Sequence, residues 1–157
     1  MDVIVGIGEY AVSDNCNDVI KTFALSSCVA ITVYSKTKKV AGMVHIALPT
    51  PPASKIVSIK KPCYYATTAI PYIINKMYHD FGCHKDELDI NIFGGADSIR
   101  NNDVFNIGKK NIIAVKKTLM YLNIKRFRSQ IGGTNSRTLK MEVETGKITV
   151  DEQPIKI

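Results

Sequence analysis

The chain has 157 residues, of which 45% are apolar and 22% charged, and its formal net charge is +7. These shares are close to globular averages, so they exclude intrinsic disorder as the overall state. No window approaches the roughly 18 consecutive apolar residues of a membrane-spanning helix, and the first ten residues lack the basic and apolar regions of a secretory signal. We therefore expect one soluble, cytoplasmic domain over residues 1–157.

The first third of the chain has the composition of β-strands. Four segments rich in β-branched residues are separated by turn-prone Asn, Asp, Ser and Lys. They are VIVGIG (3–8), VIKTFAL (19–25), CVAITVYS (28–35) and VAGMVHIAL (40–48). Nearly continuous apolar runs such as CVAITV favour strands that are covered on both faces.

The rest of the chain mixes helices and strands. The proline-rich stretch 49–62 indicates a surface loop, and apolar residues at helical spacing between Ala66 and Met77 predict a helix in which Pro71 forces a kink or a restart. A strand over 89–95, a helix over 108–121 and a terminal hairpin around the turn Glu144–Lys147 follow. Because strands and helices do not alternate strictly, we expect an α+β fold: a layered sandwich of mixed or antiparallel sheet with about two main helices.

The spacing of the four cysteines indicates neither a metal site nor a disulfide framework. They are Cys16, Cys28, Cys63 and Cys83. A chain of this length without an export signal does not need disulfides to stabilise its core. His79 and Cys83 are four residues apart, and Cys63 is a conceivable third zinc ligand. Structural zinc sites use four ligands at tighter spacing, so packing is favoured over zinc binding.

The positive charge is concentrated in the second half of the chain. Between Val104 and Met141 there are nine basic residues and no acidic ones: Lys109, Lys110, Lys116, Lys117, Lys125, Arg126, Arg128, Arg137 and Lys140. Such a segment is either a solvated surface or an attractor for an acidic partner. Nucleic acid is the weaker alternative, because no aromatic-interleaved or recognition-helix motif accompanies the charge.

Cys28 and His45 form the pair of residues with catalytic potential. If the strands that carry them form a hairpin whose loop is centred between Lys36 and Thr37, the two residues lie directly opposite, with Cβ atoms about 4.5–5.5 Å apart. A neighbouring imidazole lowers the pKa of a thiol and protonates its leaving group, and backbone N–H groups near the cysteine could stabilise an oxyanion. A buried structural cysteine beside a core histidine remains the alternative.

The motifs resemble those of the CheD family of bacterial chemoreceptor glutamine deamidases along nearly the whole chain. The matching blocks are GIGEY (6–10), TFALSSCVA (22–30), MVHIALP (43–49), GGA (94–96), NIGKKN (106–111) and the stretch from the Gly132–Gly133 pair to ETGK (144–147). The resemblance implies a layered fold like the catalytic domain of cytotoxic necrotizing factor toxins. It also implies a catalytic triad of Cys28, His45 and Thr22, with no metal or organic cofactor.

The same resemblance implies the substrate and the partners. The substrate would be glutamine side chains on chemoreceptor cytoplasmic helices, converted to glutamate through a cysteine thioester with release of ammonia, and the CheY-P phosphatase CheC would act as regulator. No nucleic acid and no membrane insertion are expected. The alternative is a catalytically weak or inactive module that binds CheC or receptor. The chain has Ser26 where the family usually has glycine before Ser-Cys.

Overall fold

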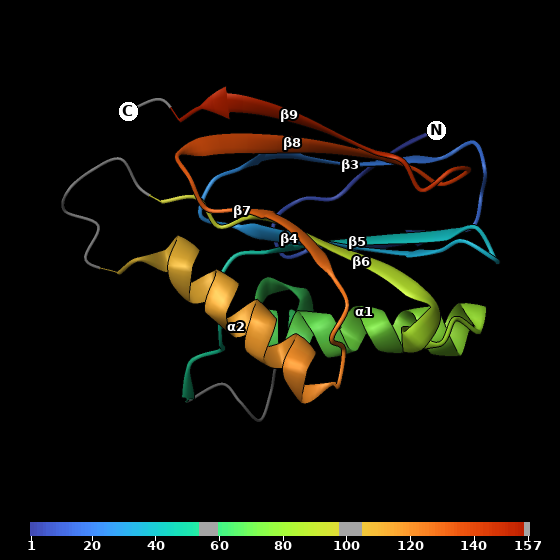
Figure 1. Ribbon diagram of the computed structural model, residues 1–157, viewed down its shortest axis with the longest axis horizontal. Helices are drawn as coiled ribbons and strands as arrows, with labels where there is room; N and C mark the ends of the chain where they lie inside the picture. The colour runs from blue at the N-terminus through green and yellow to red at the C-terminus, as the bar shows by residue number, and fades with distance from the viewer. Residues whose placement is uncertain (54–59, 98–104, 156–157) are drawn as a thin grey trace.

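The computed structural model describes residues 1–53, 60–97 and 105–155 and has three layers. Two β-sheets stack face to face, and two helices cover the outer face of one of them (Figure 1). The order of the layers is therefore sheet, sheet, helices. The expected α+β sandwich with two main helices is confirmed.

The outer sheet has four strands in the order β1-β3-β8-β9. Its strands are β1 (Asp2–Ile4), β3 (Val19–Leu25), β8 (Asn135–Glu142) and β9 (Ile148–Pro154). β1 and β3 are parallel, whereas β8 runs antiparallel to both β3 and β9. One face of this sheet is open to solvent, which explains the alternating buried and exposed positions along β8.

The inner sheet has five strands in the order β2-β5-β4-β6-β7. Its strands are β2 (Tyr10–Ser13), β5 (Val40–Ile46), β4 (Val29–Ser35), β6 (Leu88–Gly94) and β7 (Arg128–Ile131). Every residue of β4 and β5 is buried, because the outer sheet covers one face and the helices cover the other. This confirms the prediction that the continuous apolar runs are strands covered on both faces.

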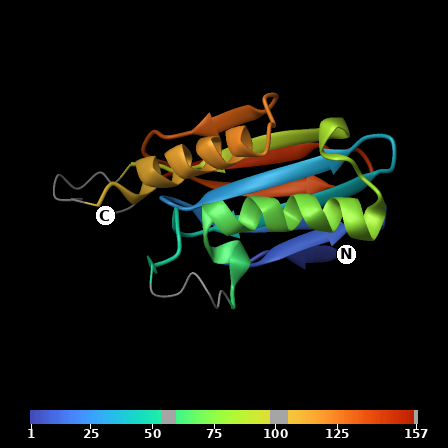
Figure 2. The ribbon, with the colours of Figure 1, turned by 90° about the horizontal axis from the view of Figure 1, so that it is seen from below.

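The helical layer consists of α1 (Ala66–Phe81) and α2 (Ile107–Tyr121), with the short helices η2 (Pro62–Tyr64) and η3 (Lys85–Glu87) beside them. Figure 2 shows the two long helices lying across the inner sheet. Ile70, Ile73 and Met77 of α1 and Val115 and Leu119 of α2 are fully buried against that sheet. A second apolar cluster fills the space between the two sheets.

The sequence prediction differs from the structure in the number of strands and in the course of α1. β2 and β7 were not expected as separate strands, and at four residues each they are too short for an alternating pattern to stand out. α1 continues through Pro71 without a break and ends at Phe81, where the left-handed backbone of Gly82 (φ 70°) caps it. The predicted loop over 49–62 lies partly outside the described residues, which exclude 54–59.

No helix in the described part of the chain is long and apolar enough to cross a membrane.

Candidate active site

Thr22 and His45 meet in the space between the two sheets. Thr22 comes from β3 of the outer sheet and His45 from β5 of the inner sheet, and both side chains are buried. Thr22 Oγ1 lies 2.7 Å from His45 Nδ1 and also 2.7 Å from the carbonyl oxygen of Val5. The two predicted residues are therefore joined by a hydrogen bond that links one sheet to the other.

The two contacts of Thr22 fix the tautomer of His45. A carbonyl oxygen only accepts, so the single hydroxyl proton of Thr22 is donated to Val5. Oγ1 must then accept from Nδ1–H of the imidazole. The other ring nitrogen, Nε2, is left without a proton, and it is buried with no hydrogen-bond partner among the described residues. A buried lone pair without a donor is suited to accept a proton.

A β-bulge directly after Thr22 shapes the strand that carries it. The pairing of β3 with β8 shifts between Thr22 and Leu25, and Ala24 has a left-handed backbone with φ 53°. In a regular strand, residues three apart point to opposite faces, yet both Thr22 and Leu25 are fully buried. The bulge absorbs one residue, so that both face the inter-sheet space. The Ala24 N–H is satisfied by Thr138 Oγ1 at 3.1 Å.

Cys28 immediately precedes β4 and is diagonal to His45 rather than opposite. The residue paired with His45 is Ala30, because the loop between β4 and β5 spans residues 36–39 and is centred one residue later than predicted. Cys28 lies two residues before Ala30, so both point to the same face, and Cys28 packs against the inter-sheet cluster. Diagonal neighbours have Cα atoms roughly 7–8 Å apart and Cβ atoms somewhat closer. The prediction that Cys28 and His45 lie directly opposite each other is therefore wrong. The two residues do lie on the same face of the inner sheet.

Burial makes the cysteine and the histidine a neutral pair. Loss of solvation lowers the pKa of His45 to about 4, and the same cause raises the pKa of the Cys28 thiol above its ordinary value. At neutral pH the imidazole is therefore unprotonated and the sulfur is a thiol. The expectation that the imidazole lowers the pKa of Cys28 is not met in this structure, because burial is the cause that acts on the thiol and it raises the pKa.

The backbone around Cys28 is held by the segment after β6. The Gly95 N–H donates to the Cys28 carbonyl oxygen at 2.9 Å, and the Ala96 N–H donates to that of Ser26 at 2.7 Å. Gly94 is required here, because a Cβ atom at that position would collide with the Cys28 carbonyl oxygen. Ser26 does not have a positive φ, so the exchange of the usual glycine for serine brings no backbone strain.

No three His, Cys, Asp or Glu side chains in the described part of the chain gather closely enough to hold a metal ion. Cys63 and Cys83, the cysteines of the zinc alternative, are both buried in the core cluster between the inner sheet and the helices.

The basic segment does not form one surface. Lys110 and Lys117 of α2 line an open groove of about 650 Å³ between α1 and α2, together with apolar side chains that include Pro71 and Ile113. Arg137 instead lies inside the fold, where its Nε contacts Glu152 at 3.0 Å. None of Thr22, Cys28 and His45 lines the groove. The lysines of α2 are exposed and available to a partner, as are Lys125, Arg126, Arg128 and Lys140 outside that helix.

Solved structures share the architecture. The hypothetical protein YfiH from Bacillus licheniformis superposes with a TM-score of 0.52 at 10% identity over 77% of this chain. YlmD from Geobacillus stearothermophilus does so with a TM-score of 0.51 at 7% identity over 78% of this chain. This chain spans about half the length of either protein, 49% and 50%. The fold is therefore a layered α+β fold of the YfiH and YlmD kind, consistent with the layered fold that the sequence resemblance implies.

The sequence comparisons identify the family. The model of the family described as CheD chemotactic sensory transduction matches residues 47–152. A probable chemoreceptor glutamine deamidase CheD from Syntrophotalea carbinolica is 42% identical over 95% of this chain and 93% of its own length. The chemoreceptor glutamine deamidase CheD of Thermotoga maritima is 36% identical over 96% of this chain and 91% of its own. The chain belongs to the CheD family.

The buried neutral His45 predicts a specific dependence of stability on pH. Its folded-state pKa of about 4 lies below the ordinary 6.5, so the unfolded chain binds a proton more readily between these two values. The stabilisation is complete above pH 6.5 and is lost as the pH falls to about 4, by roughly 3 kcal/mol. Urea unfolding at both ends of this range should show this loss, and the loss should be smaller by that amount in His45→Gln. An equal loss in both proteins would contradict the assignment.

Proposed function

We propose that the protein is a cysteine-dependent deamidase that converts glutamine side chains of chemoreceptors to glutamate. The observation that carries the proposal is the hydrogen bond from His45 to Thr22, which leaves a buried, unprotonated Nε2 on the face that also carries Cys28. Relatives named chemoreceptor glutamine deamidase support the reaction and the substrate. Cys28 is the nucleophile, His45 the general acid and base, and Thr22 the residue that holds the imidazole.

In the first half-reaction, Cys28 Sγ attacks the amide carbon of the substrate. Because the thiol is neutral, its proton passes to His45 Nε2 as the C–S bond forms and the carbonyl π electrons move onto oxygen. Collapse of this tetrahedral intermediate breaks the C–N bond, and Nε2–H gives its proton to the departing nitrogen. Ammonia leaves, and the acyl group remains on sulfur as a thioester.

In the second half-reaction, water hydrolyses the thioester. His45 Nε2 takes a proton from water while the oxygen attacks the thioester carbon, and the C–S bond breaks as the sulfur recovers that proton. The sum is glutamine and water giving glutamate and ammonia. Sγ and Nε2 are not hydrogen-bonded in this structure, so the step requires Cys28 to turn toward the ring when substrate binds, as catalytic contacts often tighten only in the complex.

The proposal includes the cellular setting that the family resemblance implies. The substrate glutamines lie on cytoplasmic receptor helices, so the protein acts in the cytoplasm. A CheC phosphatase that covers the deamidase site would regulate it. No metal or organic cofactor takes part in the steps above.

Mass spectrometry of a receptor fragment tests the proposed function. Each deamidated glutamine gains about one dalton, and Cys28→Ala should give no gain because no thioester forms. The folded state should persist in this variant, since the truncation removes a single sulfur atom at a half-buried position. Receptor that binds to the wild-type protein without gaining mass would instead support the alternative of an inactive binding module.

Thr22 variants test the role of the buried hydroxyl. Thr22→Val keeps the shape of the side chain but cannot accept from Nδ1–H, so kcat should fall roughly 10–100-fold, a part of what a positioned base supplies. Thr22→Ser keeps the hydroxyl and should retain most of the rate. The residual activity of Thr22→Val should exceed that of Cys28→Ala. If Thr22→Val is as active as the wild type, Thr22 has no catalytic role and the site consists of Cys28 and His45 alone.

Charge reversal on α2 tests whether its lysines attract an acidic receptor helix. Lys116 and Lys117 are exposed, so replacing both with Glu should lower kcat/KM at low ionic strength, and added salt should shrink the difference. The matched control changes Lys36 and Lys147 to Glu, since both are exposed and Lys36 lies in the turn at the opposite end of β4 from Cys28. An equal loss of kcat/KM in the control variant would show that the α2 lysines contribute to solubility and do not attract the substrate.

A further inference from the structure

Asn111 is a buried polar side chain that contacts the backbone on both sides of the candidate active site. It lies on α2 and is fully buried. Its Nδ2 donates to the carbonyl oxygen of Ser27 at 2.9 Å and to that of Ala47 at 3.0 Å. Ser27 directly precedes Cys28, and Ala47 lies two residues after His45. One amide group thus ties the two strands of the site together at their ends.

The orientation of the Asn111 amide follows from its neighbours. Both contacts are carbonyl oxygens, which only accept, so the NH2 end of the side chain must face them. Oδ1 is then left buried without a hydrogen-bond partner among the described residues. An unpaired buried oxygen lowers the stability of a fold. An apolar side chain would avoid that cost, so the two hydrogen bonds of Nδ2 are what this asparagine supplies.

The close approach of α2 makes the contact with Ser27 possible. Gly108, one turn before Asn111, packs directly on the segment after β6: a Cβ atom there would collide with the Ala96 carbonyl oxygen and lie 2.8 Å from that of Gly95. The same segment holds Ser26 and Cys28 through its own N–H groups. The carbonyl oxygens of three consecutive residues, Ser26, Ser27 and Cys28, are therefore all held in fixed directions.

The fixed carbonyl of Ser27 determines where the N–H of Cys28 points. No peptide bond in the described residues is cis, and in a trans peptide the C=O of one residue and the N–H of the next point in opposite directions. The Ser27 carbonyl oxygen is directed at the Asn111 amide, so the Cys28 N–H points away from that amide. The Cys28 side chain packs on the other face of the sheet, against the inter-sheet cluster. Neither the N–H nor the side chain of Cys28 is therefore directed at Asn111.

We infer that Asn111 is a positioning residue that orients the Cys28 N–H as a donor to the oxyanion formed during deamidation, an inference that rests on the proposed function. When Sγ bonds to the amide carbon, the negative charge appears on an oxygen one bond away from that carbon, within reach of the N–H of the same cysteine. Without Asn111, the Ser27 carbonyl oxygen loses the hydrogen bond that fixes the plane of the Ser27–Cys28 peptide, and the donor is less well preorganised.

The test compares two reactions of Cys28 in Asn111→Ala. Deamidation passes through an oxyanion, so kcat should fall about 100-fold while KM stays within about twofold. Alkylation by iodoacetamide displaces iodide and forms no oxyanion, so its rate at Cys28 should stay within about twofold of wild type. Leu119→Ala is the matched control. Leu119 is fully buried two turns further along α2, and its truncation lowers stability without removing a hydrogen bond to Ser27.

Each outcome decides the inference. Unchanged kcat in Asn111→Ala, or an equal fall in the Leu119→Ala control, would overturn it, as would a parallel loss of deamidation and alkylation.

If Asn111→Ala does not fold, a measurement on the wild-type protein tests the inference. With a peptide whose glutamine side chain ends in an aldehyde, Sγ bonds to the aldehyde carbon and the thiol proton moves to its oxygen. The Cys28 amide proton should then shift downfield, and an unmoved signal would overturn the inference. A wild-type protein without any deamidation would refute the proposed function, whereas this shift does not depend on turnover.

Discussion

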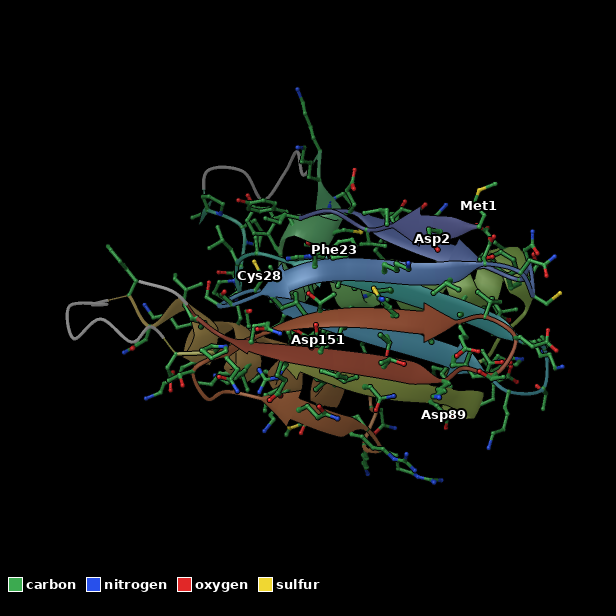
Figure 3. The ribbon with its side chains drawn as sticks, turned by 90° about the horizontal axis from the view of Figure 1, so that it is seen from above. Met1, Asp2, Phe23, Cys28, Asp89 and Asp151 are labelled. Carbon is green, nitrogen blue, oxygen red and sulfur yellow. The ribbon has the colours of Figure 1, made fainter. Side chains whose placement is uncertain are left out.

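The hydrogen bond between Thr22 and His45 connects the two sheets, and the proposed chemistry depends on it. Thr22 faces the inter-sheet space through the regular alternation of β3, two residues after the buried Ile20, and its hydroxyl proton is donated to the carbonyl oxygen of Val5. His45 reaches the same space from a strand whose residues are all buried. Figure 3 views the molecule from the side of the outer sheet, with Cys28 near one end of the strands. The site is thus assembled across a layer boundary, where water is excluded.

Exclusion of water determines which form of acid–base chemistry is available. Burial alone keeps both the thiol and the imidazole neutral, with the pKa of His45 near 4 and that of Cys28 raised. A preformed thiolate–imidazolium pair would be stabilised by an exposed or positively charged surrounding. In the proposed reaction the proton moves as the C–S bond forms, because the resting thiol is neutral.

The sequence was sufficient to predict the elements whose signals are local, but not the contacts between layers. The β-branched runs predicted β3, β4 and β5, and the covered faces followed from the absence of alternation. The predicted centre of the β4–β5 loop differs from the structure by one residue, because turn composition does not determine which residues close a four-residue loop. The role of Thr22 is implied only by the family resemblance. Asn111 belongs to the NIGKKN motif (106–111), but the sequence indicates no role for it. Both act through partners more than 20 residues away in sequence, which no spacing rule can reveal.

The protonation of His45 in the resting protein tests the account most directly. Nitrogen-15 NMR of the imidazole distinguishes the two neutral tautomers from each other and from imidazolium. The structure predicts a proton on Nδ1 and a bare Nε2 at neutral pH, unchanged until the pH approaches about 4, and a loss of this tautomer preference in Thr22→Val. A proton on Nε2, or an imidazolium signal at neutral pH, would contradict the neutral pair and the role of Thr22.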